Sequence, residues 1–247
     1  MSWGNFIFRV ILNNEIPFNR TEILGWTMIK KISKLFSDHS QITLIVSILL
    51  MIIFSPYYWD APLANYFNFI FLSFILFSAI LTLKKRSNLL KVIKRAGYFI
   101  IILTLIAAIS DNSYVELVNR ILFVLFFMLV AINLLIGIIR SNEVDTDVIF
   151  SAVAVYVLFG FCGAILAAVI MFFEPAAFSL NSTYSSQFHQ FLYFSFVTIT
   201  TTGYGDILPI TPLARTQAIF LALFGQLYLT VIIGILIGKY LSGSGKV

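Results

Sequence analysis

Long apolar stretches, separated by short polar ones, run through most of the chain. A helix needs about 20 mainly apolar residues to cross a lipid bilayer. Six stretches come close to this length or exceed it, at residues 42–59, 63–83, 97–110, 115–139, 148–173 and 213–240. The third is short and needs neighbouring residues to complete a crossing. The pattern therefore predicts an all-α membrane protein with six transmembrane helices.

A shorter apolar segment, residues 188–200, lies between the last two predicted spans. It is too short to cross a membrane, and a glycine-spaced run, residues 201–206, follows it. Non-helical backbone at membrane depth is tolerated only where protein buries it or where it lines an aqueous path. We therefore predict a re-entrant helix with a returning loop; a helix lying in the membrane interface is the alternative.

The composition supports a membrane setting. Hydrophobic residues make up 60% of the 247 positions and charged residues only 11%, which is too little charged surface for a soluble domain of this size. Cys162 is the single cysteine, so no internal disulfide forms, and we expect it to pack as a small apolar residue. His39 and His189 lie on opposite sides of the predicted membrane, and no Asp, Glu or Cys residues cluster within it. We therefore expect neither enzyme activity nor a cofactor.

Basic residues are distributed unevenly between the predicted loops. With six crossings, 14 of the 16 Lys and Arg residues fall on one side, which the positive-inside rule assigns to the cytoplasm. Both termini are then cytoplasmic, the chain is a multi-pass protein of the cell membrane, and the loop after residue 200 opens outward. The net charge of +5 reflects this sidedness and contact with anionic membrane lipid, not binding of nucleic acid.

Residues 1–41 form the only sizeable polar segment, and we expect them to be cytoplasmic. Within them, residues 18–36 either form a basic amphipathic helix on the inner membrane surface or belong to a partly ordered tail. Residues 57–59, Tyr-Tyr-Trp, fit an aromatic belt at the outer interface.

The run after the short apolar segment carries the candidate chemistry. Moving an ion across a bilayer requires replacement of its hydration shell, which rings of backbone carbonyls can provide for potassium. Gly203 and Gly205 favour the backbone that such a ring needs, because glycine reaches positive φ at little cost. The Thr201 hydroxyl would add an oxygen at the inner end, and Tyr204 would brace the loop from outside the axis. Successive carbonyls would come from Thr201, Thr202, Gly203 and Tyr204.

Residues 198–206, Thr-Ile-Thr-Thr-Thr-Gly-Tyr-Gly-Asp, closely resemble the signature of potassium channels. The resemblance covers residues 148–240 and continues past the signature through Pro209 and the Thr-Pro-Leu run that starts the inner helix. It implies a pore domain at residues 148–247, after a four-helix transmembrane region at residues 42–147. It also implies a homotetramer, in which K+ binds to the carbonyls of Thr201, Thr202, Gly203 and Tyr204.

The resemblance extends to residues around the run. Asp206 stands at the outer mouth, where it concentrates cations and bonds to Tyr193 on the re-entrant helix. Thr202 stands where the family usually has valine, and Val197 where some members have a glutamate behind the filter. We expect the first change to alter conductance or ion preference at most, and the second to change how Asp206 is held. His189 either tunes a response to external pH or is an ordinary solvated or hydrogen-bonded polar residue.

Three residues of the last span bear on gating. Gly225 lies midway along it, where the resemblance implies a hinge; close helix packing is an equal alternative for so small a residue. Gln226 and Thr230 are polar and would face a water-filled cavity below the filter. Thr230 could instead bond to its own helix backbone.

The fourth span lacks the charges of a voltage sensor. Each elementary charge moved across the membrane contributes only about 2.3 kcal/mol per 100 mV, so a sensor needs several of them. Arg120 is the single basic residue inside this span. We expect it to reach the outer interface or to pair with Glu116 one turn earlier.

These observations favour a potassium-selective channel that conducts passively and is not voltage-gated by this mechanism. A membrane subunit of a potassium uptake transporter and a weakly selective cation channel are the alternatives. The transporter would need repeated pore units or a partner with nucleotide chemistry, and the chain has one pore unit and no phosphate-binding motif. Tyr204 argues against a weakly selective filter. The expected partners are membrane lipid, further copies of the chain and a separate regulatory subunit.

Overall fold

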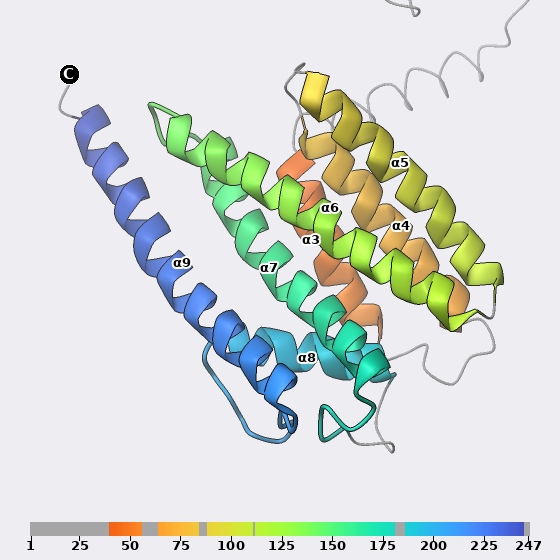
Figure 1. The fold of residues 1–247 in the computed structure, drawn as a ribbon. Helices are drawn as coiled ribbons and strands as arrows, with labels where there is room; N and C mark the ends of the chain where they lie inside the picture. The colour runs from red at the N-terminus through yellow and green to blue at the C-terminus, as the bar shows by residue number, and fades with distance from the viewer. Residues whose placement is uncertain (1–39, 56–63, 84–87, 111, 181–185, 245–247) are drawn as a thin grey trace, which may run out of the picture. The chain divides into compact units, whose positions relative to one another are not determined.

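The computed structural model describes residues 40–55, 64–83, 88–110, 112–180 and 186–244. All of them belong to one compact unit, His39–Val247. Over this part of the chain the fold is all-helical (Figure 1), with helices α3 (Ser40–Phe54), α4 (Ala64–Thr82), α5 (Asn88–Ile109), α6 (Ser113–Arg140), α7 (Thr146–Phe173), α8 (Gln187–Ile199) and α9 (Pro212–Ser244). The predicted amphipathic helix at residues 18–36 and the aromatic belt at residues 57–59 lie outside the described residues.

Helices occupy all six stretches predicted to cross the membrane. Four of them, α5, α6, α7 and α9, are long and apolar enough to span a bilayer. The described apolar parts of α3 and α4, Ser40–Phe54 and Phe69–Thr82, are shorter. The all-helical prediction is thus confirmed, while six crossings remain a prediction. Helix α5 begins at Asn88, nine residues before the predicted start, because Leu90, Ile93 and Gly97 continue its buried stripe at helical spacing.

Polar side chains fix where the helices start. The Asn112 side chain accepts a hydrogen bond from the Tyr114 amide at the start of α6 (2.9 Å), and Asp145 accepts one from the Val148 amide at the start of α7 (2.8 Å). Such N-caps satisfy amides that have no partner within the helix. Because Asp145 begins α7 so soon after α6 ends, only residues 141–145 connect the two helices. They pack against each other as antiparallel neighbours within one chain.

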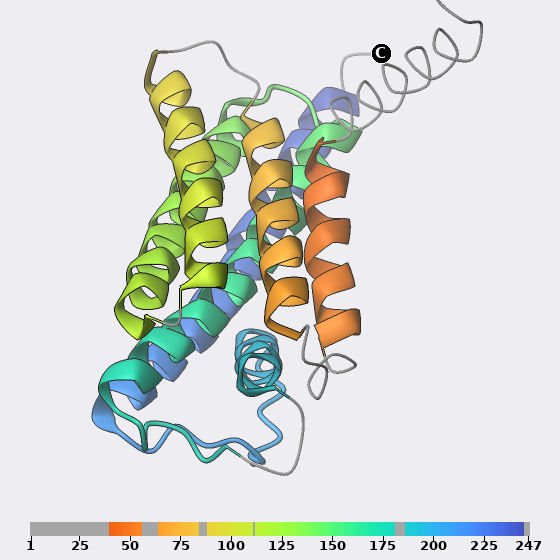
Figure 2. The same ribbon diagram turned by 90° about the vertical axis from the view of Figure 1, so that its right-hand side faces the viewer.

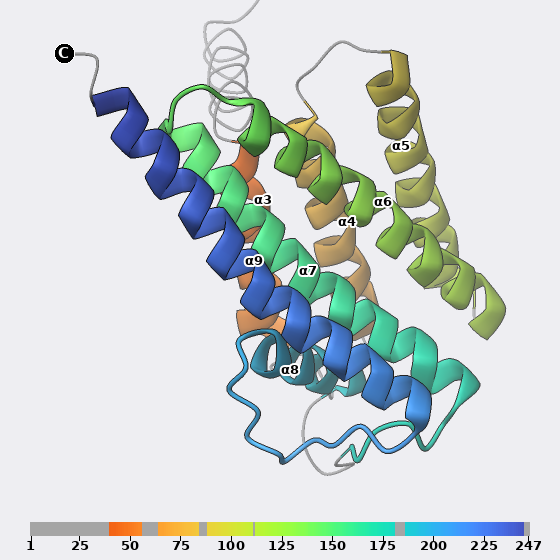
Figure 3. The same cartoon turned by 60° about the vertical axis from the view of Figure 1, so that its left-hand side comes forward.

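Helix α7 lies at the centre of the unit. It contacts α3, α6, α8 and α9, and Figure 3 shows it between α9 and α6. Small residues let α8 approach it closely: a Cβ on Gly160 would lie 2.7 Å from the Phe196 ring, and one on Gly163 would lie 2.3 Å from Ser195 Oγ. The Ser195 hydroxyl donates to the carbonyl of Gly160. Helix α8 is therefore seated directly on the α7 backbone.

Arg120 joins α6 to α7. Arg120 on α6 pairs with Glu116, as the sequence predicts, and its Nη1 also donates to the Ala168 carbonyl of α7 at 3.3 Å. A cavity of about 410 Å³ lies beside this pair, lined by α3, α4, α5, α6 and α7 and by Ser186 and Gln187 at the start of α8. Arg120 thus links α6 to α7 through the Ala168 carbonyl.

A lysine near the end of α9 caps the end of α6. The Lys239 ammonium donates to the carbonyls of Ile138, Ile139 and Ser141, at 2.7, 2.8 and 2.7 Å. The last carbonyls of a helix have no partner within it and carry partial negative charge, so a cation there is stabilising. Two segments distant in the sequence are tied together at this point: the last part of α9, and the end of α6 with the connection that follows it.

Replacing Lys239 with methionine is expected to lower the melting temperature of the purified protein by several degrees. A cation at a helix C-terminus contributes up to about 2 kcal/mol in a partly buried setting, and about 1 kcal/mol corresponds to roughly 2–4 °C for a chain of this size. Thermal unfolding in detergent measures the shift. Lys91→Met is the matched control, since exposed Lys91 donates to Asn88 one turn away on its own helix (3.1 Å) and not to another helix end among the described residues. Equal melting temperatures for both variants would contradict the capping role.

Candidate functional site

Helix α8 lies across one end of the α7–α9 pair, and Figure 2 views it nearly end-on. Ser186 caps its start by accepting a hydrogen bond from the His189 amide at 3.2 Å. One face carries the buried residues Phe191, Leu192, Phe194, Ser195 and Ile199. The helix ends at Ile199, as the sequence predicts to within a residue, and the glycine-spaced run begins there.

A Schellman motif turns the chain at the end of α8. The Thr201 amide donates to the Thr198 carbonyl, and the Thr202 amide donates to the Val197 carbonyl, both at 3.0 Å. The residue at the turn of this motif takes the left-handed conformation and is usually glycine. Here it is Thr201, with φ of 58°. For a residue with a side chain this conformation costs about 1–2 kcal/mol, so surrounding contacts must hold Thr201 in place.

Positive φ recurs at every second residue of the run. Thr201, Gly203 and Gly205 have φ of 58°, 54° and 79°, while Thr202 and Tyr204 are not in this region. Alternation of this kind turns successive carbonyls toward one side of the strand and the amides toward the other. The sequence predicts the conformation of the two glycines but not that of Thr201. A row of carbonyl oxygens on one side of the strand would be a ligand set suited to a hard cation.

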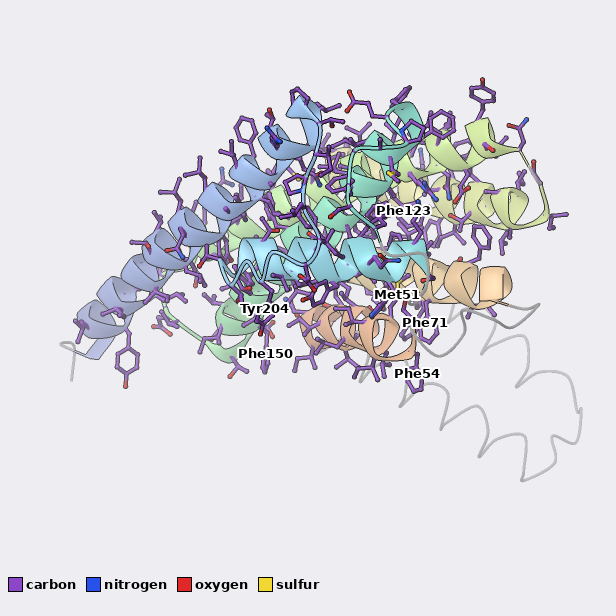
Figure 4. The ribbon with its side chains drawn as sticks, turned by 90° about the horizontal axis from the view of Figure 1, so that it is seen from below. Met51, Phe54, Phe71, Phe123, Phe150 and Tyr204 are labelled. Carbon is purple, nitrogen blue, oxygen red and sulfur yellow. The ribbon has the colours of Figure 1, made fainter. Side chains whose placement is uncertain are left out.

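The outer end of the run is held by an aromatic residue of α8. The Tyr193 hydroxyl donates to Asp206 Oδ2 at 2.7 Å, so the predicted contact is present. The bond to the Asp206 carboxylate raises the pKa of Tyr193 to about 12. The rings of Tyr193 and Tyr204 stack with their centroids 6.5 Å apart, and Figure 4 shows Tyr204 on the segment that returns beside α8. Asp206 therefore has a hydrogen-bond partner within its own chain, on α8, without an acidic group at position 197.

The segment after the run is tied to the loop that follows α7. The amides of Ser179 and Ile210 donate to the carbonyls of Leu208 (3.0 Å) and Ala177 (2.8 Å). The Leu208 amide also donates to the Ser179 hydroxyl at 2.7 Å. These bonds hold the chain after the glycine-spaced run, and the Schellman motif at the end of α8 holds it before the run.

The threonines at the base of the run also bond to one another. The Thr200 and Thr202 hydroxyl oxygens lie 3.0 Å apart, and the Thr200 hydroxyl also donates to the Phe196 carbonyl at 2.7 Å. Valine at position 202 could not make the first contact. The threonine at position 202 therefore adds a hydrogen bond beside the strand.

Helix α9 touches the base of the run. A Cβ on Gly225 would lie 2.0 Å from the Ile199 carbonyl oxygen, so close packing needs glycine here. The same carbonyl accepts a bond from the Tyr156 hydroxyl of α7 at 3.1 Å. The hinge role of Gly225 stays a prediction, whereas its packing role rests on this contact. The sequence does not predict the hydrogen bond between Tyr156 and Ile199, because no residue spacing indicates that these two positions lie close together.

Two polar residues of α9 differ in what they bond. Gln226 Nε2 donates to Thr201 Oγ1 at 3.1 Å. The Thr230 hydroxyl donates to the Gln226 carbonyl at 2.9 Å, which is the backbone bond that the sequence allows as an alternative to cavity lining. Both residues are exposed in the single chain. Gln226 reaches the candidate site directly and Thr230 does not.

His189 is half-buried near the start of α8, and its Nδ1 has no hydrogen-bond partner among the described residues. Burial lowers the pKa of its imidazole. The side chain therefore has less solvent around it than the sequence suggests.

Residues 148–241 match a family model described as "Ion channel". No curated protein and no solved structure gave a significant match. The matched residues contain most of α7, all of α8, the glycine-spaced run and most of α9. The match supports an ion channel and, together with the apolar helices, a membrane protein that acts as a channel and not as an enzyme.

Proposed function

We propose that the protein is a potassium-selective channel that conducts K+ passively. The observation that carries the proposal is the alternation of positive φ at Thr201, Gly203 and Gly205, within the part of the chain that matches an ion channel family. A strand whose carbonyls all face one side can replace the hydration shell of a weakly hydrated cation. The proposed K+ ligands are the carbonyls of Thr201, Thr202, Gly203 and Tyr204 and the hydroxyl of Thr201.

One strand cannot surround an ion, so the pore needs several copies of the chain around an axis. We propose a homotetramer. Residues 201–206 are exposed in the single chain, and Tyr204 is 71% exposed, as expected of a surface that other copies cover. Large apolar side chains on α9 are exposed as well, among them Phe220 (69%) and Leu227 (62%). Other copies and membrane lipid are the proposed partners of these surfaces.

We further propose that the channel spans the cell membrane six times with both termini in the cytoplasm and is not gated by a charged voltage sensor. Arg120 is the single basic residue within α6 before Arg140 at its end. Its bonds to Glu116 and to the Ala168 carbonyl leave it in a fixed position. A separate regulatory subunit remains a proposed partner.

A reversal-potential measurement in asymmetric K+ and Na+ tests the proposal. With purified protein in planar bilayers, the reversal potential is expected to follow the K+ gradient, and open probability is expected to change little with voltage. Equal currents of Na+ and K+ would contradict K+ selectivity and favour a weakly selective cation channel. Flux that requires a second protein with nucleotide hydrolysis would favour the transporter subunit.

A further inference from the structure

Helix α9 contacts the base of the filter strand through two successive residues. Gly225 brings the helix backbone against the Ile199 carbonyl, where a Cβ would lie 2.0 Å from the oxygen. Gln226, the next residue, donates from Nε2 to Thr201 Oγ1 at 3.1 Å. Gly225 thus allows α9 to approach the end of α8 closely, and the Gln226 side-chain amide is then near enough to bond to Thr201.

Thr201 needs a contact of this kind. Its amide bond to the Thr198 carbonyl holds the turn, but it does not fix the rotation about the Cα–Cβ bond, which selects one of the few staggered χ1 rotamers. The Oγ1 and the methyl group of a threonine can exchange places by such a rotation. A hydrogen bond to Oγ1 keeps the oxygen, and not the methyl group, on the side that faces α9.

We propose that Gln226 is a positioning residue for the innermost cation site. The Thr201 hydroxyl is the ligand at this site, and the hydrogen bond from Gln226 orients it. This inference rests on the proposed function. A hydroxyl oxygen has two lone pairs; the Gln226 amide takes one, and the second is left for a cation on the axis. Repeated in each copy, the contact presents a ring of hydroxyl oxygens below the carbonyl rings.

The neighbouring polar residue cannot take over this role. The Thr230 hydroxyl is bonded to the Gln226 carbonyl at 2.9 Å, on its own helix. The Thr200 and Thr202 hydroxyls bond to each other at 3.0 Å. Among the residues that the structure describes, Gln226 is the one whose side chain donates to Thr201 Oγ1.

The test is the K+ concentration that gives half-maximal current. Gln226→Leu and Gln226→Met both remove the donor, and methionine also keeps the unbranched shape. Each is expected to raise the half-saturating K+ concentration about threefold to tenfold, which is the range that one hydrogen bond of ordinary strength controls. Gln217→Leu is the matched control, because Gln217 lies on the same helix and donates from Nε2 to the Gly163 carbonyl at 2.6 Å, away from the filter. It should leave the half-saturating concentration unchanged.

A double-mutant cycle with Thr201→Val separates a positioning role from a general structural one. If Gln226 acts through the Thr201 hydroxyl, Gln226→Met changes nothing further once that hydroxyl is absent. Additive effects of the two substitutions would overturn the inference. So would a half-saturating K+ concentration that is unchanged in both Gln226 variants. Either result, with a wild type that conducts K+, would leave the proposed function intact. Loss of assembly in both variants would also overturn it, since the contact would then be needed for folding. A wild type without K+-selective current would refute the proposed function itself.

Discussion

Replacement of Gly203 with alanine is expected to abolish K+-selective flux while leaving the fold of the chain intact. Gly203 has φ of 54°, and a Cβ added to it would meet no atom within 4 Å, so conformation and not space requires glycine. A left-handed alanine costs about 1–2 kcal/mol, and in a ring of copies every strand bears this cost. A strand that relaxes to negative φ turns its carbonyl away from the others. Potassium and thallium uptake into liposomes, compared with sodium uptake, measures the loss.

Gly137→Ala provides the control for this experiment. It also has open space around the added Cβ, but it lies in α6 without positive φ, so selective flux should persist. Size-exclusion chromatography should show the same assembly for both variants. Tyr204→Leu is a second variant of the run. If both Gly203→Ala and Tyr204→Leu retained K+ selectivity, the filter would have to lie elsewhere in the chain.

Replacement of Gly225 with alanine is expected to destabilise the protein and reduce K+ flux. The added Cβ would lie 2.0 Å from the Ile199 carbonyl oxygen and 2.9 Å from its carbon, and backbone atoms cannot rotate away as a side chain can. Helix α9 must then move from the end of α8. Overpacking of this kind typically costs about 1–3 kcal/mol, which corresponds to a fall of several degrees in melting temperature.

The same variant separates packing from hinge action at Gly225. A pure hinge predicts the opposite sign for stability, because alanine favours an exposed helix over glycine by about 1 kcal/mol. Gly234→Ala is the comparison, since no atom lies within 4 Å of its added Cβ. A melting temperature that rises for both variants, with opening reduced only in Gly225→Ala, would favour the hinge.

The apolar pattern predicted the helices well because their length and composition depend on the bilayer and not on tertiary contacts. It predicted α8 and its end to within a residue, and glycine at 203 and 205 predicted positive φ there. The start of α5 was misplaced by nine residues, because basic residues at its start were read as a loop although the helix carries them on its surface. The six crossings, the tetramer and the ion ligands remain predictions.

The contacts that hold the candidate site were not predictable in the same way. Thr201 takes a conformation that its residue type disfavours, so propensity points away from it. Lys239 caps a helix about 100 residues earlier in the chain, and Tyr156 bonds to the end of α8. Such pairs depend on where helices cross, which a single sequence does not encode in any local spacing. Only the small residues at 160 and 163, three apart on α7, could have indicated a close helix contact.

The short connection at residues 141–145 bears on how the protein is made. It places α6 and α7 side by side in one chain, so the early helices find their docking surface as soon as α7 has entered the membrane. Each polypeptide can then complete most of its tertiary structure during synthesis, before it meets another copy. Later association would join finished subunits and would not require exchange of helices between them. We therefore expect the proposed tetramer to assemble after each subunit has folded, because the connection at residues 141–145 holds α6 against α7 of the same chain.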